Sequence, residues 1–171
     1  MGDHINITKL RKKDTNQLKQ TLITLYPKAT EFIKSCEEIT LVKEGGIEVL
    51  VLNETPAFTK HENTYIPTLL LIKLRIKDLT PKAVVDEGAV KHLINGADVM
   101  APGIIEVEEF KEGEIVSVWE PKKETPIVVG KALMNSKTIK EVRKGRAIKN
   151  IHHVGDKLWN LTIKIYMKQT T

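Results

Sequence analysis

The sequence predicts an α+β protein in which a mixed α/β region is followed by a small β-barrel with an internal helix. Three observations lead to this fold class. Helical and strand periodicities alternate in the first part of the chain. The polar segment at residues 77–82, which holds a proline, then separates the two parts. Short strands with frequent turn signals follow, as in a small barrel. We therefore expect domains at residues 1–77 and 78–171.

The first region opens with an expected edge strand within residues 4–10. Asp14 or Thr15 is expected to cap a helix that ends before Pro27. A second short helix is predicted at about residues 28–35.

The pattern then changes to strands, with β-branched residues on both sides of Gly45-Gly46, which indicates a hairpin over residues 39–51. Residues 53–64 include a proline and have no apolar period, so they are expected to form a surface loop. The apolar run after Thr68 is compatible with a helix or a strand, and a helix with Thr68 as its cap is favoured.

The most specific stretch is residues 84–104, in which Asp86 is suited to cap a helix and Asn95-Gly96 to end it. Apolar residues at helical spacing between them predict one buried face. An extended run at Val99 and Met100 follows, and Pro102-Gly103 is expected to turn the chain. Polar residues that would remain exposed on this helix form a ridge, made of Gly88, Lys91, His92 and Asn95.

Further strands are expected at residues 115–119 and 127–129, the second closed by Gly130. Ser136 is expected to cap a short helix that Gly145 ends. Two more strands are predicted at about residues 147–153 and 158–165.

Composition limits the possible partners and the compartment. The chain has 171 residues, one cysteine and a formal net charge of +5. A single cysteine excludes a disulfide within the chain and a multi-cysteine zinc site, and it fits a reducing compartment, so we expect a cytoplasmic protein. No apolar run approaches the roughly 20 residues of a membrane helix, so no membrane association is expected. No cofactor is expected.

The charges are segregated along the second region. Residues 98–124 carry three basic and eight acidic groups, a net −5, whereas residues 131–157 carry eight basic and two acidic groups, a net +6. A basic segment of this kind suits an anionic partner such as RNA. An ordinary solvated surface explains the charges equally well.

No motif for catalysis is evident, since the sequence lacks a glycine-rich phosphate loop, HExxH and GxSxG. His152 and His153 would point to opposite faces of a strand, so a structural role or a partner contact is favoured over shared metal binding. Metal binding shared between His92 and one residue of a nearby strand remains open. We expect a protein that is not an enzyme.

Two blocks resemble the PUA domain, an RNA-binding module named for pseudouridine synthases and archaeosine transglycosylases. The first block is residues 85–93 with residues 96–104, and the second is residues 129–132 with residues 145–148. Residues 65–69 and 148–153, with Leu158-Trp159, look like the family of the malignant T-cell amplified sequence protein. Its members join a pre-PUA domain to a PUA domain, and it includes archaeal stand-alone relatives of this length.

This resemblance implies an RNA-binding surface on the internal helix, the loop after it and a late strand. Carried onto this chain, the RNA-binding residues are Gly88, Lys91, His92, Asn95, Gly96, Ala97, Asp98, Met100, Lys131, Arg146, Lys149 and His152. Gly88 would let a sugar-phosphate backbone approach, although tight packing is an equal explanation. His152 could equally be a core histidine, and Lys91 and Lys149 could be ordinary solvated lysines. We expect Lys91 and Arg146 to lie on one face.

The function implied is binding of structured RNA, tRNA or ribosomal RNA, during translation initiation or recycling. The partners implied are RNA, the small ribosomal subunit and a protein bound through the N-terminal domain. Two alternatives remain, an accessory factor for RNA modification and a protein-interaction adaptor that docks through the pre-PUA domain.

Overall fold

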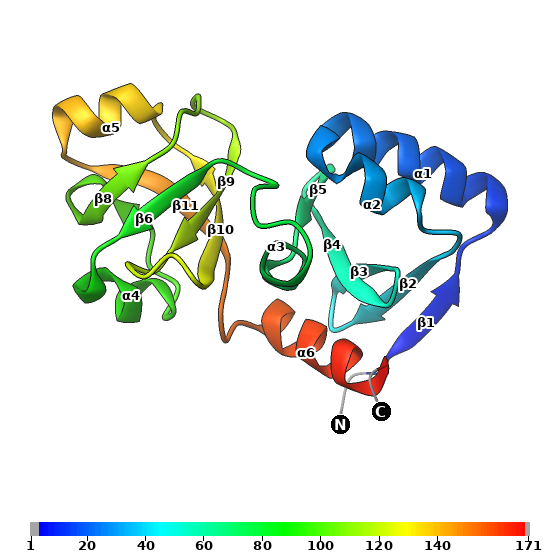
Figure 1. Cartoon of the computed structure of the whole chain (residues 1–171). Helices are drawn as coiled ribbons and strands as arrows, with labels where there is room; N and C mark the ends of the chain where they lie inside the picture. Colours follow the sequence, from blue (N-terminus) through cyan, green and yellow to red (C-terminus); the bar gives the residue numbers. More distant parts are fainter. Residues whose placement is uncertain (1–3, 170–171) are drawn as a thin grey trace. The chain divides into compact units, whose positions relative to one another are not determined.

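The first half of the chain builds an antiparallel sheet, with helices α1 and α2 over one of its faces (Figure 1). The computed structural model describes residues 4–169. The strands, in spatial order, are β1 (Asn6–Lys9), β2 (Ile39–Glu44), β3 (Ile47–Leu52), β4 (Thr55–His61) and β5 (Thr64–Pro67). The helices are α1 (Lys12–Leu25), the 3-10 turn η1 (Pro27–Ala29), α2 (Thr30–Lys34) and α3 (Leu69–Leu74).

Two local predictions in this half are confirmed. Gly45 and Gly46 have φ angles of +56° and +80°, the backbone that a tight hairpin turn between β2 and β3 requires. Thr68 caps α3, and its hydroxyl accepts a hydrogen bond from the Leu71 N–H at 3.1 Å. The apolar run after Thr68 is therefore a helix.

The loop expected at residues 53–64 is wrong, because this segment forms β4 and most of the turn into β5. Asn53 and Glu54 turn the chain with φ angles of +49° and +62°, so the hairpin has no glycine to signal it. Pro56 pairs with Val51 just after a register shift in the ladder, and such an irregularity is where a strand tolerates proline.

The predicted cap of α1 is also wrong. Arg11 occupies the N-cap position, and Asp14 lies in the first turn, where its carboxylate accepts a hydrogen bond from Arg11 Nε at 2.9 Å. An acidic side chain in the first turn still favours the helix through its dipole.

The second half forms the expected barrel, a mixed six-stranded sheet in which only β6 and β9 are parallel. In spatial order its strands are β7 (Val99–Met100), β11 (Arg146–His153), β10 (Pro126–Ala132), β9 (Ile115–Trp119), β6 (Lys82–Val85) and β8 (Ile104–Val107). The edge strands β7 and β8 are joined by the short turn η2 (Ala101–Gly103), so the sheet is nearly closed.

Two helices lie at opposite ends of this barrel, α4 (Glu87–Leu93) and α5 (Ser136–Val142) (Figure 1). The cap of α5 is Asn135, whose side chain accepts a hydrogen bond from Thr138 N at 2.8 Å, and not Ser136. Ser136 is instead buried and bonded to the backbone of Phe110. The helix closes at Arg143, which has a left-handed backbone, and not at Gly145.

The strand expected at residues 158–165 is wrong, because these residues belong to helix α6 (Lys157–Gln169). Leu161, Thr162 and Ile165 are buried and lie at the spacing of a helical face. The alternation of Leu161, Ile163 and Ile165 resembled a strand, but Leu161 and Ile165 are buried one helical turn apart, whereas Ile163 is only partly buried.

The chain folds into two compact units. One comprises the residues up to Leu79 together with those from Asn160 onward, and the other is Thr80–Trp159. The division into domains at residues 1–77 and 78–171 stays a prediction. Among the residues that the structure describes, no helix is long and apolar enough to cross a membrane.

Candidate nucleic-acid interface

Helix α4 is fixed by its cap and by one buried face. The Asp86 carboxylate accepts a hydrogen bond from the Ala89 N–H at 2.9 Å, as the sequence predicted. Leu93 is buried in the barrel core, with Ala89 and Val90 packed against that core. The opposite side of the helix leaves Gly88, Lys91 and His92 exposed. The predicted polar ridge is therefore present on the surface.

Gly88 is not required for packing. A Cβ atom built on it would meet only the Asp86 carboxylate oxygen, at 3.4 Å. An alanine therefore fits at this position, and the explanation of Gly88 as a tight packing contact loses its support.

The loop after α4 begins as predicted. Gly96 has a φ angle of +97°, which closes the helix, and the Ala97 N–H donates to the His92 carbonyl at 3.0 Å. Asn95, Gly96 and Ala97 are exposed. The loop then enters β7, where the exposed Met100 pairs with Arg146 of β11.

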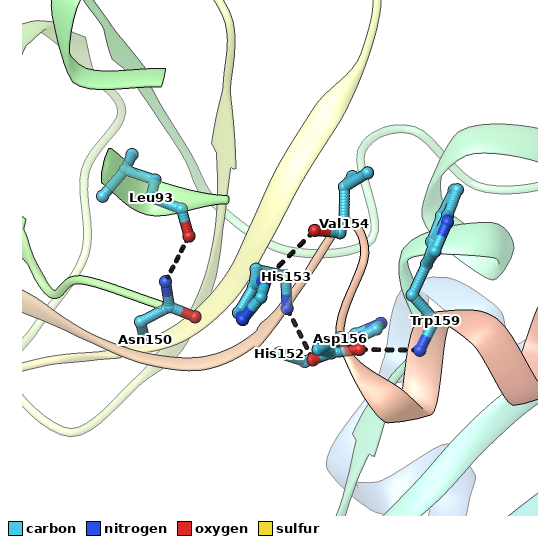
Figure 2. Close-up of polar contacts among 7 residues, drawn as sticks. All are labelled: Leu93, Asn150, His152, His153, Val154, Asp156 and Trp159. Carbon is cyan, nitrogen blue, oxygen red and sulfur yellow. Dashed lines mark hydrogen bonds and ion pairs between the residues drawn. The ribbon is translucent and has the colours of Figure 1, made fainter. Parts of the chain in front are cut away.

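Four hydrogen bonds from β11 hold this loop in place. The Asn150 side-chain amide donates to the Leu93 carbonyl at 3.0 Å (Figure 2) and to the Ala97 carbonyl at 2.9 Å. The Asp98 carboxylate accepts from the Asn150 N–H at 2.9 Å and from Arg146 Nη1 at 3.0 Å. The loop after α4 and strand β11 are thereby brought together. That Lys91 and Arg146 share one face stays a prediction.

Asn150 was not among the predicted site residues. A single strand asparagine carries no signal in the sequence, because its partners are backbone carbonyls of a helix end more than fifty residues earlier in the chain.

Lys131 and Lys149 lie directly opposite each other on β10 and β11, and both are exposed. Neither lysine has an ion pair with any residue within 4–169. Like charges directly opposite each other on a sheet are destabilising. The two lysines therefore form a site of uncompensated positive charge, and a bound anion would reduce the repulsion between them.

Gly130 brings the two strands close enough for this pairing. A Cβ atom on Gly130 would lie 2.5 Å from the Lys149 carbonyl oxygen and 2.5 Å from Ile148 Cγ2. The ladder also shifts register between Val129 and Gly130. Gly130 was expected to close the strand, but β10 continues through it to Ala132, and its role is close backbone approach.

His152 has no exposed surface. Its Nδ1 lies 3.0 Å from an Asp156 carboxylate oxygen, and that carboxylate also accepts hydrogen bonds from the backbone N–H groups of His153 and Trp159 (Figure 2). Burial by itself would raise the pKa of Asp156, but the hydrogen bonds and the charge of His152, with the two N–H groups, hold it below its usual value. In this conformation the His152 ring cannot reach a ligand on the surface.

No group of three or more His, Cys, Asp or Glu side chains suited to a metal ion occurs within residues 4–169.

Comparison with known proteins places this arrangement in a family. The model of the PUA domain matches residues 81–154. An uncharacterized protein of Methanocaldococcus jannaschii is 44% identical over 154 residues, which covers 88% of this chain and 93% of that protein. Translation machinery-associated protein 20 of Saccharomyces cerevisiae is 30% identical over 169 residues, which covers 92% and 93%. Malignant T-cell-amplified sequence 1 of Rattus norvegicus is 29% identical, with coverage of 90% and 87%.

Two solved archaeal structures share the fold. A hypothetical protein of Pyrococcus horikoshii is 33% identical with a TM-score of 0.76, covering 92% of this chain and 99% of that chain. A PUA domain from Aeropyrum pernix, crystallised with tartrate, is 25% identical with a TM-score of 0.84, covering 96% and 94%. The chain thus carries a PUA domain and belongs to the family of malignant T-cell-amplified sequence 1 and translation machinery-associated protein 20.

Proposed function

We propose that this protein binds structured RNA, tRNA or ribosomal RNA, through its PUA domain in a translation setting. The proposed contact is a loop–strand surface, defined as Gly88, Lys91, His92, Asn95, Gly96, Ala97, Asp98, Met100, Lys131, Arg146 and Lys149. The observation that carries the proposal is the direct opposition of Lys131 and Lys149, neither of which pairs with a carboxylate of residues 4–169. A phosphate between the two ammonium groups would replace their repulsion with two charge-assisted hydrogen bonds.

The loop after α4, which hydrogen bonds from β11 hold in place, supports the same proposal. Asp98 holds the Arg146 guanidinium in one position, while Asn150 fixes the backbone on both sides of Gly96. A preorganised surface loses little entropy on binding, so more of the contact energy appears as affinity. His92 is exposed and can stack on a base or bind a 2′-hydroxyl. His152 is left out of the contact because its ring is buried.

RNA of defined shape is favoured over a flexible single strand. The loop–strand surface contains no Phe, Tyr or Trp on which successive bases could stack. Its cationic groups suit phosphates, which position a nucleic acid without reading its sequence. Recognition would therefore depend on the shape and backbone of a folded RNA.

The translation setting is supported by sequence similarity to a known protein. A relative that aligns with nearly the whole chain is named a translation machinery-associated protein. The small ribosomal subunit is the proposed place of action, with a further protein partner bound through the N-terminal sheet. The proposed activity is binding, and no reaction is assigned to the chain.

The test measures binding of the purified full chain to bulk tRNA and to small ribosomal subunits at several salt concentrations. We compare the wild type with the double variant Lys131→Glu/Lys149→Glu. Exposed lysines of the acidic segment supply a matched control, Lys111→Glu/Lys122→Glu, with the same change in net charge. The site variant should weaken binding by roughly 100-fold or more at 100 mM salt, because two phosphate contacts become repulsive, while the control stays within about threefold.

Equal losses in both double variants would reduce the effect to net charge and contradict the proposal. If neither variant changes RNA binding while a protein partner still co-purifies with the chain, the adaptor function replaces it.

A further inference from the structure

A second basic surface lies on helix α5 and the residues directly after it, outside the loop–strand surface. We call Lys137, Lys140 and Lys144 the α5 patch. All three side chains are exposed, and none has an ion pair with a residue in the described part of the chain. Glu141 is the one acidic residue between Lys137 and Arg146.

The fold holds this patch in a fixed position. Ser136 anchors the start of α5 through two hydrogen bonds to Phe110, and Ile139 is buried in the barrel core. Arg143 ends the helix with a left-handed backbone, and its guanidinium lies 3.5 Å from the carbonyl oxygens of Pro102 and Ile104. A non-glycine residue rarely adopts this backbone, so the helix end is specified by these contacts.

The α5 patch is linked to the loop–strand surface through the backbone at Gly145 and Arg146. Gly145, which follows Lys144, accepts a hydrogen bond from Ala101 N–H at 2.9 Å, and the next residue, Arg146, pairs with Met100. From Arg146, strand β11 runs about 13 Å to Asn150, which binds the end of α4. Because α4 and α5 lie at opposite ends of the barrel (Figure 1), β11 joins two cationic areas.

The chemistry of the patch selects its partner. Residues 136–146 include no aromatic side chain, so bases cannot stack there. Lysines on a helix surface act as point charges that suit phosphate oxygens and carry no sequence information. A duplex keeps its phosphates at regular positions over the length that separates α5 from α4, whereas a flexible strand must be ordered to reach both areas.

We infer that the α5 patch is a second phosphate-binding area, which contacts the backbone of a double-stranded segment of the RNA bound at the loop–strand surface. This inference rests on the proposed function and extends its footprint along β11. The contact is independent of sequence and adds affinity for RNA that continues as a duplex beyond the first contact.

The test uses the full chain, bulk tRNA and poly(U) as probes, and the double variant Lys140→Ala/Lys144→Ala. Alanine favours the helix at position 140, and Lys144 is an exposed residue after the helix, so the fold should be retained, which circular dichroism verifies. Lys111→Ala/Lys122→Ala is the matched control, with the same loss of charge in the same unit.

For tRNA we expect about tenfold weaker binding and a salt dependence of log K that is less steep by roughly 1.5, the loss of two phosphate contacts. The matched control should change neither quantity. Binding of poly(U), which we expect to be weaker than that of tRNA, should change by less than about threefold.

Unchanged tRNA affinity and salt slope in the α5 variant would overturn this inference. The same result is expected if the patch binds an acidic protein and not RNA. An equal loss for poly(U) would overturn the duplex assignment. The proposed function is tested separately, since Lys131→Glu/Lys149→Glu weakens tRNA binding by roughly 100-fold or more if the loop–strand surface is correct, whatever the α5 variant does.

Discussion

The Asn150 side chain donates one hydrogen bond to the Leu93 carbonyl and one to the Ala97 carbonyl, and so fastens the end of α4 to β11. Its own amide oxygen is buried and has no hydrogen-bond donor in the structure. Asn150 is thus held in one orientation by two acceptors, and an isosteric acid would place a carboxylate against both carbonyl oxygens.

We expect Asn150→Ala to reduce the free energy of unfolding by about 1–3 kcal/mol, because two carbonyl groups lose their donor. Asn150→Asp should cost more than Asn150→Ala, since a negative charge then faces two acceptors. Urea unfolding measures both, and amide hydrogen exchange should show faster opening of residues 94–98. If the aspartate variant is as stable as the wild type, the observed orientation of the amide is not what stabilises this loop.

Gly130→Ala should destabilise the barrel by about 1–3 kcal/mol or more. The added Cβ would lie 2.5 Å from the Lys149 carbonyl oxygen. This oxygen belongs to the backbone of β11, so it cannot rotate away as a side-chain atom can. Thermal unfolding measures the loss. Gly113→Ala is the comparison, because a Cβ atom on Gly113 meets no atom within 4 Å. The positive φ of Gly113 adds a smaller cost of its own. Equal losses would mean that the close approach of the strands at Gly130 costs no more than the strained backbone at position 113 does.

The sequence predicted those parts of the site whose signals are local. The Asp86 cap and the Gly96 stop of α4 both depend on residues within a few positions of the helix they limit, and both are confirmed. A strand was expected at about residues 147–153, and β11 is found there. The clamp from Asn150 to Leu93 and Ala97 was not predicted, because long-range contacts to backbone carbonyls leave no pattern in the side chains.

The two segments with wrong secondary structure also have physical causes. The turn at Asn53 and Glu54 uses left-handed backbone without glycine, so no hairpin signal followed β3 and the strand β4 was expected to be a loop. Asp156 directly precedes helix α6, and its carboxylate accepts a hydrogen bond from the Trp159 N–H at 2.7 Å, which is a capping contact. The adjacent Gly155 made this segment resemble a turn between two strands.

Lys149→Glu should stabilise the fold while it weakens RNA binding. The introduced carboxylate faces Lys131 across the ladder, and an opposite-charge pair contributes roughly 0.2–1 kcal/mol where the lysine pair was repulsive. Thermal unfolding at low salt should therefore give a higher midpoint, and the gain should shrink at 1 M salt. A lower midpoint would mean that the two side chains do not interact as their register implies.

Gly88→Ala separates stability from binding on α4. Alanine in place of glycine within a helix gains about 0.5–1 kcal/mol, and the structure has room for the methyl group. The proposed close approach of an RNA backbone at Gly88 predicts weaker tRNA binding in the same variant, by about three- to tenfold. Binding that is unchanged in a stabilised variant would remove Gly88 from the proposed contact.

Asp156 makes part of the stability dependent on acid pH. Its pKa is lowered in the folded state, so the folded protein holds its proton less tightly than the unfolded chain does. The corresponding stabilisation is complete above the unfolded-state pKa of about 3.9, and it is lost as the pH falls through the lower folded-state value. Asp156→Asn keeps an acceptor for the Trp159 N–H but has no charge beside His152, so the variant should be less stable at pH 6 and should lose less of its remaining stability between pH 4 and pH 2. Urea unfolding at a series of pH values measures this, and parallel pH profiles for the two proteins would mean that the Asp156 carboxylate does not contribute to acid unfolding.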